Sequence, residues 1–299
     1  MAELITEEQP RIKFSTRYVG PLGPLGQSAG PDATAPAGSD GGACDGGGGD
    51  DDGDGSPLAR LAHLARLMHR MEELGAAPIL NDGQVAGNCA VSPGLLAPVG
   101  GRQGSGGEAA ASDGSGDGEA AAPGAEGRDG LALVSMSGKP PGHVLDPAAD
   151  FVLVTEFDRS AWTACYRSRS PAVRPSSDSP LLVAALAHGQ EYGWTELPRV
   201  VLHGHALAEG EGLSYAAQLG LPISPHATLF STPEDLAELE ALFRSHPYPQ
   251  HRCYIRRGHG FFLLGRSLAE AERLFEQLVV PWLEGGRRGE VGHVVQPEP

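Results

Sequence analysis

The sequence has few cysteines, few aromatic residues and no long apolar run. Its four cysteines, Cys44, Cys89, Cys165 and Cys253, are scattered without Cys-x-x-Cys spacing. No apolar run approaches the roughly 18 residues that a membrane-spanning helix needs. The start, MAELITEEQP, has neither the basic and apolar regions of a secretory signal nor an Arg-rich transit pattern. We therefore expect a reduced, cytoplasmic protein with no membrane partner.

Positive charge is also scarce. The chain has 22 Lys and Arg against 38 Asp and Glu, a formal net charge of −16, and no basic patch with interleaved aromatic residues. The usual signature of a nucleic-acid-binding protein is therefore absent, and we expect no nucleic-acid partner. Residues 20–57 carry −7 and residues 100–130 carry −4, so together they account for −11 of the −16. Most of the negative charge therefore lies in these two segments and does not indicate a partner-binding surface.

The same two segments are rich in Gly, Ala, Ser and Asp and hold too few apolar side chains to offset the entropy cost of ordering the backbone. We expect both to be disordered. The predicted organisation is an N-terminal strand segment at 1–19, a Gly/Asp-rich insert at 20–57, one domain at 58–284 interrupted by the insert at 100–130, and a tail at 285–299.

The remaining sequence alternates between strand and helix patterns. Residues 58–74 are the clearest helix, with apolar side chains at three- to four-residue spacing, Ser56 placed to cap it and Gly75 placed to end it. Helices are also predicted from Pro180 to about Gln190, from Pro233 to near Ser245, and from Ser267 to about Leu283. Strands are predicted at 11–19, 131–136, 151–154, 162–166, 200–205, 252–255 and 261–264. This order predicts one α/β domain with helices packed on a mixed sheet.

Two histidines stand two residues apart at the end of a predicted strand, in the segment RVVLHGHA. Side chains at that spacing leave the same face of a strand, so His203 and His205 can reach one ion. A third, His259, lies between two glycines just before an apolar strand. Three imidazoles with a carboxylate suit Zn²⁺ or another borderline divalent metal.

The order of these motifs resembles the class II aldolase/adducin family, of the fuculose-phosphate aldolase type. That resemblance implies a three-layer α/β/α domain with a mixed, largely antiparallel sheet, and a catalytic Zn²⁺ or other divalent ion held by His203, His205 and His259. The segment RPSSDSP is similar to the family's PSSE motif. Its acidic residue, Asp178, would then be the catalytic base beside the metal.

Three further segments resemble the family's phosphate-binding pieces: GNCAVS, SMSGK and the serine pair of RPSSDSP. Backbone N–H groups and hydroxyls of this kind suit an oxyanion. The resemblance assigns substrate-phosphate contacts to Gly87, Asn88, Ser137, Gly138, Ser176 and Ser177.

Two departures from the family pattern stand out. The usual acid is Glu, whereas this chain has the shorter Asp178, and Gly204 occupies the centre of the His-x-His motif, where the family often has a hydroxyl. His226 and the Arg256–Arg257 pair each have two possible interpretations. His226 is either a loop residue or part of the site lining, and the Arg256–Arg257 pair is either a solvated strand end or a contact for an anionic substrate.

The resemblance implies a zinc-dependent lyase that cleaves or forms a C–C bond in a small hydroxy-carbonyl or sugar-phosphate substrate through a metal-stabilised enediolate, and that assembles as a homotetramer. Two alternatives stay open: a dehydratase or epimerase acting on a sugar phosphate, and a non-catalytic, adducin-like binding module.

Overall fold

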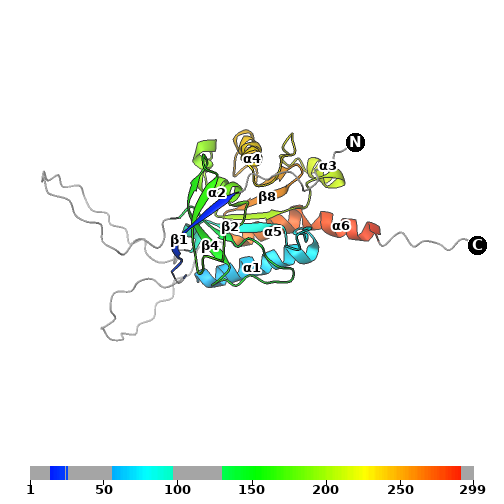
Figure 1. Cartoon of the computed structure of the whole chain (residues 1–299). Coiled ribbons are helices and arrows are strands. Elements are labelled where there is room, and N and C mark those ends of the chain that lie inside the picture. Colours follow the sequence, from blue (N-terminus) through cyan, green and yellow to red (C-terminus); the bar gives the residue numbers. More distant parts are fainter. Residues whose placement is uncertain (1–13, 24, 26–55, 97–129, 291–299) are drawn as a thin grey trace, which may run out of the picture.

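The computed structural model describes residues 14–23, 25, 56–96 and 130–290 (Figure 1). Within these residues eight strands form one sheet in the order β1-β5-β4-β3-β2-β6-β8-β7. The strands are β1 (Ser15–Pro21), β2 (Asn88–Val91), β3 (Ala132–Ser135), β4 (Phe151–Asp158), β5 (Thr163–Ser168), β6 (Val200–Gly204), β7 (Cys253–Arg256) and β8 (Gly260–Gly265). Only the β1–β5 pair is parallel among them, and every other neighbouring pair is antiparallel.

Helices cover both faces of the sheet (Figure 1). They are α1 (Pro57–Leu74), α2 (Ser179–Ala187), α3 (Gly210–Gln218), α4 (Pro233–Ser245), α5 (Leu268–Leu278) and α6 (Val280–Glu290). Residues of α1, α5 and α6 share one apolar core, and residues of α2 and α4 share the other. The three-layer architecture and the mixed, largely antiparallel sheet are thus as predicted.

Alternation along the central strands explains how one sheet supports two cores. In β6, Val200 and Leu202 belong to the core beneath α1 and α5, whereas Val201 belongs to the core beneath α2 and α4. Successive strand residues point to opposite faces. His203, two residues after Val201, therefore lies on the α2/α4 face, where its register partner Phe262 also packs.

Several element boundaries follow the predicted signals. The hydroxyl of Ser56 accepts a hydrogen bond from the N–H of Ala59, and Gly75 ends α1 in the left-handed conformation. Thr232 caps α4 and Ser267 caps α5 in the same way. These side chains satisfy N–H groups that have no partner inside the helix.

Other boundaries differ from the prediction. The last predicted helix is two helices, α5 and α6, which divide at Val279 because Pro281 lacks an N–H and its ring disfavours a continuous helix. The short elements β2 and α3 were not predicted, and α2 ends at Ala187 before a 3-10 turn at Gly189–Tyr192. Helix α6 extends to Glu290, into the range predicted as a tail.

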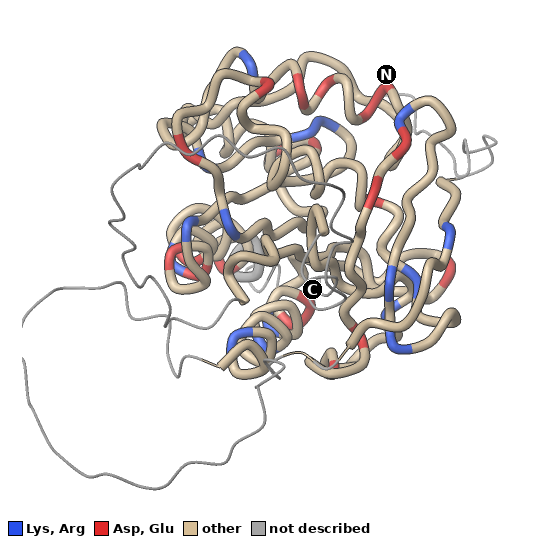
Figure 2. Tube along the Cα trace, turned by 90° about the vertical axis from the view of Figure 1, so that its left-hand side faces the viewer, with Lys and Arg blue, Asp and Glu red and all other residues tan. Residues whose placement is uncertain are grey.

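Residues 24, 26–55 and 100–129 of the two predicted inserts lie outside the described residues. At the ends of the first insert the prediction of disorder was wrong, because Gly20 and Pro21 belong to β1 and Pro57 begins α1. None of the helices in the described ranges combines the length and apolar character that a bilayer crossing requires. Lysine and arginine are interspersed with aspartate and glutamate along the described chain (Figure 2).

Candidate metal centre

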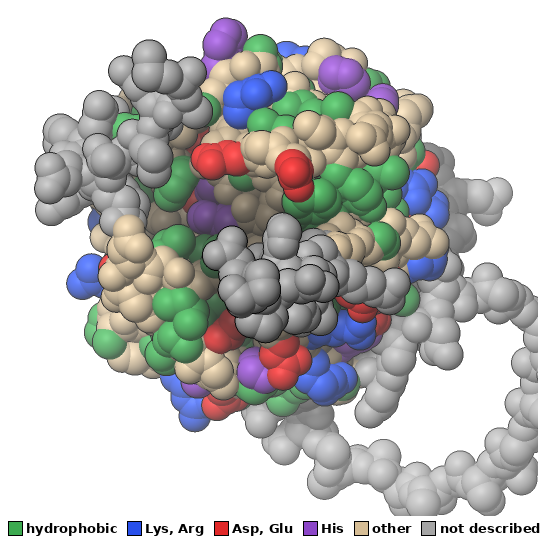
Figure 3. All heavy atoms as spheres, turned by 90° about the vertical axis from the view of Figure 1, so that its right-hand side faces the viewer, with side chains coloured by type: hydrophobic (Ala, Val, Ile, Leu, Met, Phe, Trp, Pro, Cys, Tyr) green, Lys and Arg blue, Asp and Glu red, His purple; other side chains and the backbone are tan. Residues whose placement is uncertain are grey.

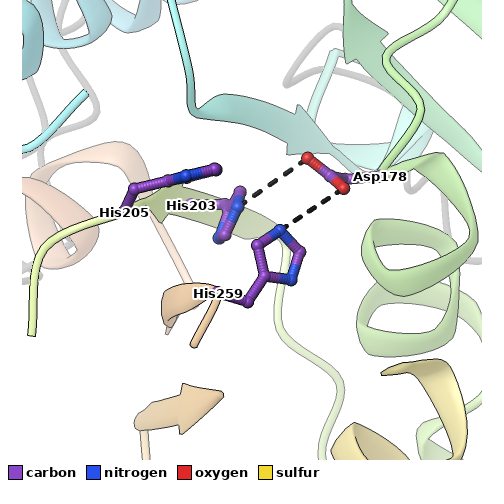
Figure 4. Close-up of side chains that lie close together, drawn as sticks. All are labelled: Asp178, His203, His205 and His259. Atoms are coloured by element: carbon purple, nitrogen blue, oxygen red, sulfur yellow. Dashed lines mark ion pairs between the residues drawn. The ribbon is translucent and has the colours of Figure 1, made fainter. Parts of the chain in front are cut away.

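Four side chains from separate parts of the chain converge on the α2/α4 side of the sheet (Figure 4). His203 lies in β6 and His205 directly follows that strand, His259 lies in the turn between β7 and β8, and Asp178 directly precedes α2. One nitrogen or carboxylate oxygen from each lies within 4.8 Å of all the others. His203, His259 and Asp178 are buried, and His205 is partly exposed.

Glycines allow the two strand ends that carry the histidines to approach each other. A Cβ on Gly260 would lie 2.0 Å from the carbonyl oxygen of Gly204, and a Cβ on Gly204 would lie 2.6 Å from the carbonyl oxygen of Ala76. Real Cβ atoms are not found so close to backbone. Gly260 also has φ +152°, which side chains disfavour. Glycine in the centre of the His-x-His motif is therefore a packing requirement in this chain.

Three imidazole nitrogens in the group are buried without a hydrogen-bond partner, and one of them, Nδ1 of His259, is in an ion pair with Asp235. His203 donates from Nδ1 to the carbonyl oxygen of Phe261 at 2.8 Å, which leaves its Nε2 as the unpartnered atom. The Nε2 atom of His259 is also buried and unpartnered. Buried polar atoms normally have a partner. Two such lone pairs beside a carboxylate fit the donor set of Zn²⁺.

Asp178 lies between the imidazoles and a set of neutral donors. Its Oδ2 and Oδ1 atoms lie 3.7 Å from Nε2 of His203 and 3.6 Å from Nε2 of His259. Asn88 donates to Oδ2 at 2.5 Å, and Ser231 donates to Oδ1 at 2.6 Å. Burial alone would raise the pKa of Asp178, but His259, His203 and the Ser231 hydrogen bond outweigh it and lower the pKa to about 2. The side chain is therefore a carboxylate at neutral pH.

The three imidazoles differ in their proton affinity. Burial and the neighbouring His259 lower the pKa of His203 to about 4. Burial and the neighbouring His203 and His259 lower the pKa of His205 to about 2. For His259, burial favours the neutral ring, but Asp235 and Asp178 outweigh it and raise the pKa. Two of the three rings are thus neutral and ready to act as ligands at physiological pH.

The segments predicted to bind phosphate lie beside this group. Ser137 donates from its backbone N–H to the carbonyl of Arg174 at 2.9 Å, and the N–H of Cys89 donates to the hydroxyl of Ser135 at 3.2 Å. These bonds hold the three segments side by side. The predicted phosphate contacts are Gly87, Asn88, Ser137, Gly138, Ser176 and Ser177.

Those six residues differ in what they can offer a ligand. Asn88 and Ser176 are buried and bonded to each other at 2.9 Å, so both belong to the support of Asp178. Ser177, Ser137 and Gly138 are exposed. Gly87 has φ +86°, and a Cβ there would lie 2.8 Å from the carbonyl oxygen of His203.

Sequence reasoning missed the segment that runs into α4. Asp235 lies 2.8 Å from His259, Ser231 bonds Asp178, and the ring of Phe230 stacks on His259 with the centroids 4.9 Å apart. From the sequence, this segment was predicted only as the start of a helix at Pro233. Nothing in the spacing indicated that this start would pack against the histidines.

Both interpretations of Arg256 were wrong. Its side chain is fully buried and paired with Asp235 at 2.9 Å, so it is neither solvated nor free for a substrate. Its neighbour Arg257 is partly buried and donates to the carbonyl of Ser224. His226 is largely exposed and pairs with Glu238, outside the converging group.

One member of the group reaches the surface of the molecule. Figure 3 shows a hollow with a histidine side chain inside it and acidic and apolar side chains around its rim. His205 is the member of the group that is partly exposed. A small molecule can therefore approach the imidazoles from solvent.

No family model matches the sequence, and no curated protein matches it. Among solved structures, L-fuculose-1-phosphate aldolase from Thermus thermophilus is 16% identical, with a TM-score of 0.41 over 81% of this chain and 100% of that one. A sugar-phosphate aldolase from Thermotoga maritima is 16% identical, with a TM-score of 0.44 over 79% and 97%. An aldolase II superfamily protein from Pseudomonas syringae is 14% identical, with a TM-score of 0.45 over 83% of each chain.

These similar structures are class II aldolase superfamily members.

Proposed function

We propose that the protein is a divalent-metal-dependent lyase of the class II aldolase type, acting on a small hydroxy-carbonyl or sugar-phosphate substrate. The observation that carries this proposal is the pair of buried, unpartnered Nε2 atoms of His203 and His259, which face one carboxylate. His203, His205 and His259 would hold the metal, with Zn²⁺ as the first choice. A bound divalent ion supplies Lewis-acid stabilisation of the negative charge that develops on substrate oxygens.

The protein's own groups would fix the substrate and move the proton. Asp178 is positioned by Asn88 and Ser231, and one of its oxygens would accept or return the proton of the reacting hydroxyl. The exposed Ser177, Ser137 and Gly138 would contact a phosphate or another oxyanion. Holding both ends of the substrate converts binding energy into orientation.

Two other functions use the same residues. A dehydratase or epimerase acting on a sugar phosphate also needs an enolate-stabilising metal and a base, so this alternative stays beside the lyase. A non-catalytic binding module would need neither buried imidazole lone pairs nor an ionised carboxylate. The buried, unpartnered nitrogens therefore favour an enzyme.

Metal content tests the centre directly. Purified protein should carry about one divalent ion per chain by elemental analysis, and His203→Ala with His205→Ala should abolish it. The matched control is His63→Ala with His69→Ala on α1, which packs in the core on the opposite face of the sheet. Full occupancy in the site variant would refute the metal centre.

Activity is tested with a panel of ketose phosphates and unphosphorylated hydroxy-ketones. A lyase releases an aldehyde, which a coupled reductase detects, whereas a dehydratase or epimerase changes the substrate without shortening its carbon chain. Metal-loaded protein that converts none of the panel, while binding the compounds, would favour the binding module.

Assembly and location are the remaining parts of the proposal. We propose a homotetramer, on the basis of the motif resemblance, and a reducing, cytoplasmic location, on the basis of the scattered cysteines without Cys-x-x-Cys spacing. Light scattering at micromolar concentration measures the assembly, and a monomer would argue against a site completed by a neighbouring subunit.

A further inference from the structure

Asp235 lies behind the converging side chains and has no role in the chemistry described above. It is in the first turn of α4, and its side chain is fully buried. Its Oδ2 atom lies 2.8 Å from Nδ1 of His259, on the opposite edge of the ring from the unpartnered Nε2. The contact has the distance of an ion pair but not the angle of a hydrogen bond.

A fully buried carboxylate needs compensating charge and donors. Arg256, which is equally buried, supplies them through Nε and Nη2, both 2.9 Å from Oδ1 of Asp235. The backbone N–H of Ser231 donates to Oδ2 at 3.1 Å, and the hydroxyl of Thr228 donates to Oδ1 at 3.2 Å. Asp235 is therefore held as an anion in one orientation.

We propose that Asp235 is a positioning residue that keeps the proton of His259 on Nδ1, turns Nε2 toward Asp178 and so sets the metal affinity of the centre. The proposal rests on the metal centre of the proposed function. A carboxylate on the far nitrogen of a ligand imidazole fixes its tautomer and raises its basicity.

His203 and His259 differ in the group that contacts Nδ1. Nδ1 of His203 meets a neutral backbone carbonyl, that of Phe261, whereas Nδ1 of His259 meets a carboxylate that is itself paired with Arg256. Of these two buried ligands, His259 is thus the one whose donor strength depends on a titratable side chain. A change at Asp235 should alter the His259 signal and leave that of His203 nearly unchanged.

Glu240 offers a matched control on the same helix. Its side chain is also buried and pairs with Arg159 at 2.5 Å and with Arg244 at 3.2 Å. It does not belong to the converging group. Glu240→Gln therefore removes a buried carboxylate of α4 without touching a metal ligand.

The experiment measures zinc affinity of the full-length protein by competition with a chromophoric chelator. Asp235→Asn should weaken zinc binding about ten- to a hundredfold, the usual effect of losing such a partner. Glu240→Gln should stay within about threefold of the natural protein. Because Asp235→Asn leaves Arg256 unpaired, Asp235→Asn with Arg256→Gln is measured too and should show the same loss. Affinity within threefold in both Asp235 variants overturns the proposal.

A second readout separates positioning from a general loss of structure. Long-range ¹H–¹⁵N NMR reports which nitrogen of each histidine carries the proton. His259 should be protonated on Nδ1 in the metal-free protein and lose that preference in the Asp235 variants, whereas His203 should not change. Equal changes at both rings, in step with a lower melting temperature, would show a merely structural role and overturn the proposal. If the natural protein binds no zinc, the proposed metal centre is refuted. The metal-free spectrum still tests Asp235 in that case, because a His259 ring without a proton on Nδ1 overturns the positioning role.

Discussion

Asn88 and Asp178 are joined by a 2.5 Å hydrogen bond in which the amide donates to Oδ2 of the carboxylate. Asn88 begins β2, directly opposite His203 in the β2–β6 ladder. Its second amide hydrogen is donated to the hydroxyl of Ser176 at 2.9 Å. One buried amide therefore links the strand that carries a candidate metal ligand to the segment that carries the candidate base.

This link predicts two different outcomes at position 88. Asn88→Ala removes a donor to an ionised, buried group and should lower the free energy of unfolding by about 1.5–3 kcal/mol. Asn88→Asp sets a second carboxylate against Asp178 and should cost more at pH 7. Acid should then restore part of the stability of Asn88→Asp, because repulsion raises the pKa of one carboxyl group.

Urea denaturation at pH 7 and pH 5 measures both effects. Gln218→Ala, at the exposed C-terminal end of α3, is the control and should lie within about 0.5 kcal/mol of the natural protein. An Asn88→Asp protein that loses stability on acidification as the natural protein does would show that the two carboxyl groups do not interact.

Gly204 should not accept a side chain. A Cβ there would meet the Ala76 carbonyl oxygen at 2.6 Å and the Phe261 ring at 2.8 Å. Gly204→Ala should cost about 1–3 kcal/mol, the range for overpacking, and should weaken metal binding because His203 and His205 flank it. Gly94→Ala, where a Cβ meets nothing within 4 Å, is the control. Equal melting temperatures and equal metal contents for the two variants would contradict the packing argument.

The pKa values of the three imidazoles should be shifted in opposite directions in the metal-free protein. The pKa of His203 is lowered to about 4 and that of His205 to about 2, mainly by burial, whereas that of His259 is raised by Asp235 and Asp178 against its burial. NMR titration of the ring protons should therefore find that, of these three histidines, one has a pKa above 6.5 and two have a pKa well below it. Three pKa values near 6.5 would contradict the buried geometry.

The same shifts fix the sign of the stability change. Between about pH 4 and 6.5 the unfolded chain binds more protons at His203 and His205 than the folded one, so these two residues add stability as the pH rises. His259 acts oppositely, because its stabilisation is present below 6.5 and is lost as the pH rises through its raised pKa. His259→Gln should therefore remove the decline in stability as the pH rises above about 6.5, as measured by urea denaturation of metal-free protein.

The sequence predicted the parts of the centre that depend on strand periodicity. His203 and His205 share a face because they are two residues apart, and the glycines around His259 signalled a close turn. The fold class and most strands followed from the same patterns. Short elements such as β2 did not, because four buried residues show no alternation that distinguishes a strand from a loop.

The sequence could not predict the support of the centre. Asp235 precedes His259 by a helix and a strand, and only the packing of α4 against β7 brings its carboxylate to the ring. Arg256 was misread because two adjacent arginines usually mark a solvated position, whereas burial here is compensated by Asp235. Tertiary pairing of this kind leaves no periodic signal.

Asp178 has two competing roles that its geometry makes testable. Both of its oxygens accept a hydrogen bond, and its pKa of about 2 makes it a weak base but a good anionic ligand. If Asp178 is the base, Asp178→Asn should keep the metal and lower turnover by about 10²–10⁴. If Asp178 is a fourth ligand, the same change should weaken metal affinity first. Elemental analysis and turnover on the same preparation distinguish the two.

Asp178→Glu tests whether the shorter acid is an adaptation. The Asp178 oxygens lie 3.6–3.7 Å from the two imidazole nitrogens and are already bonded to Asn88 and Ser231, so one more methylene should push the carboxylate toward the ligands and out of those bonds. We expect lower turnover with the metal retained, and no change for Asp158→Asn at the exposed end of β4. A gain in lyase turnover for Asp178→Glu would show that this site has lost its acid, and turnover within about twofold for Asp178→Asn would show that Asp178 is not the base.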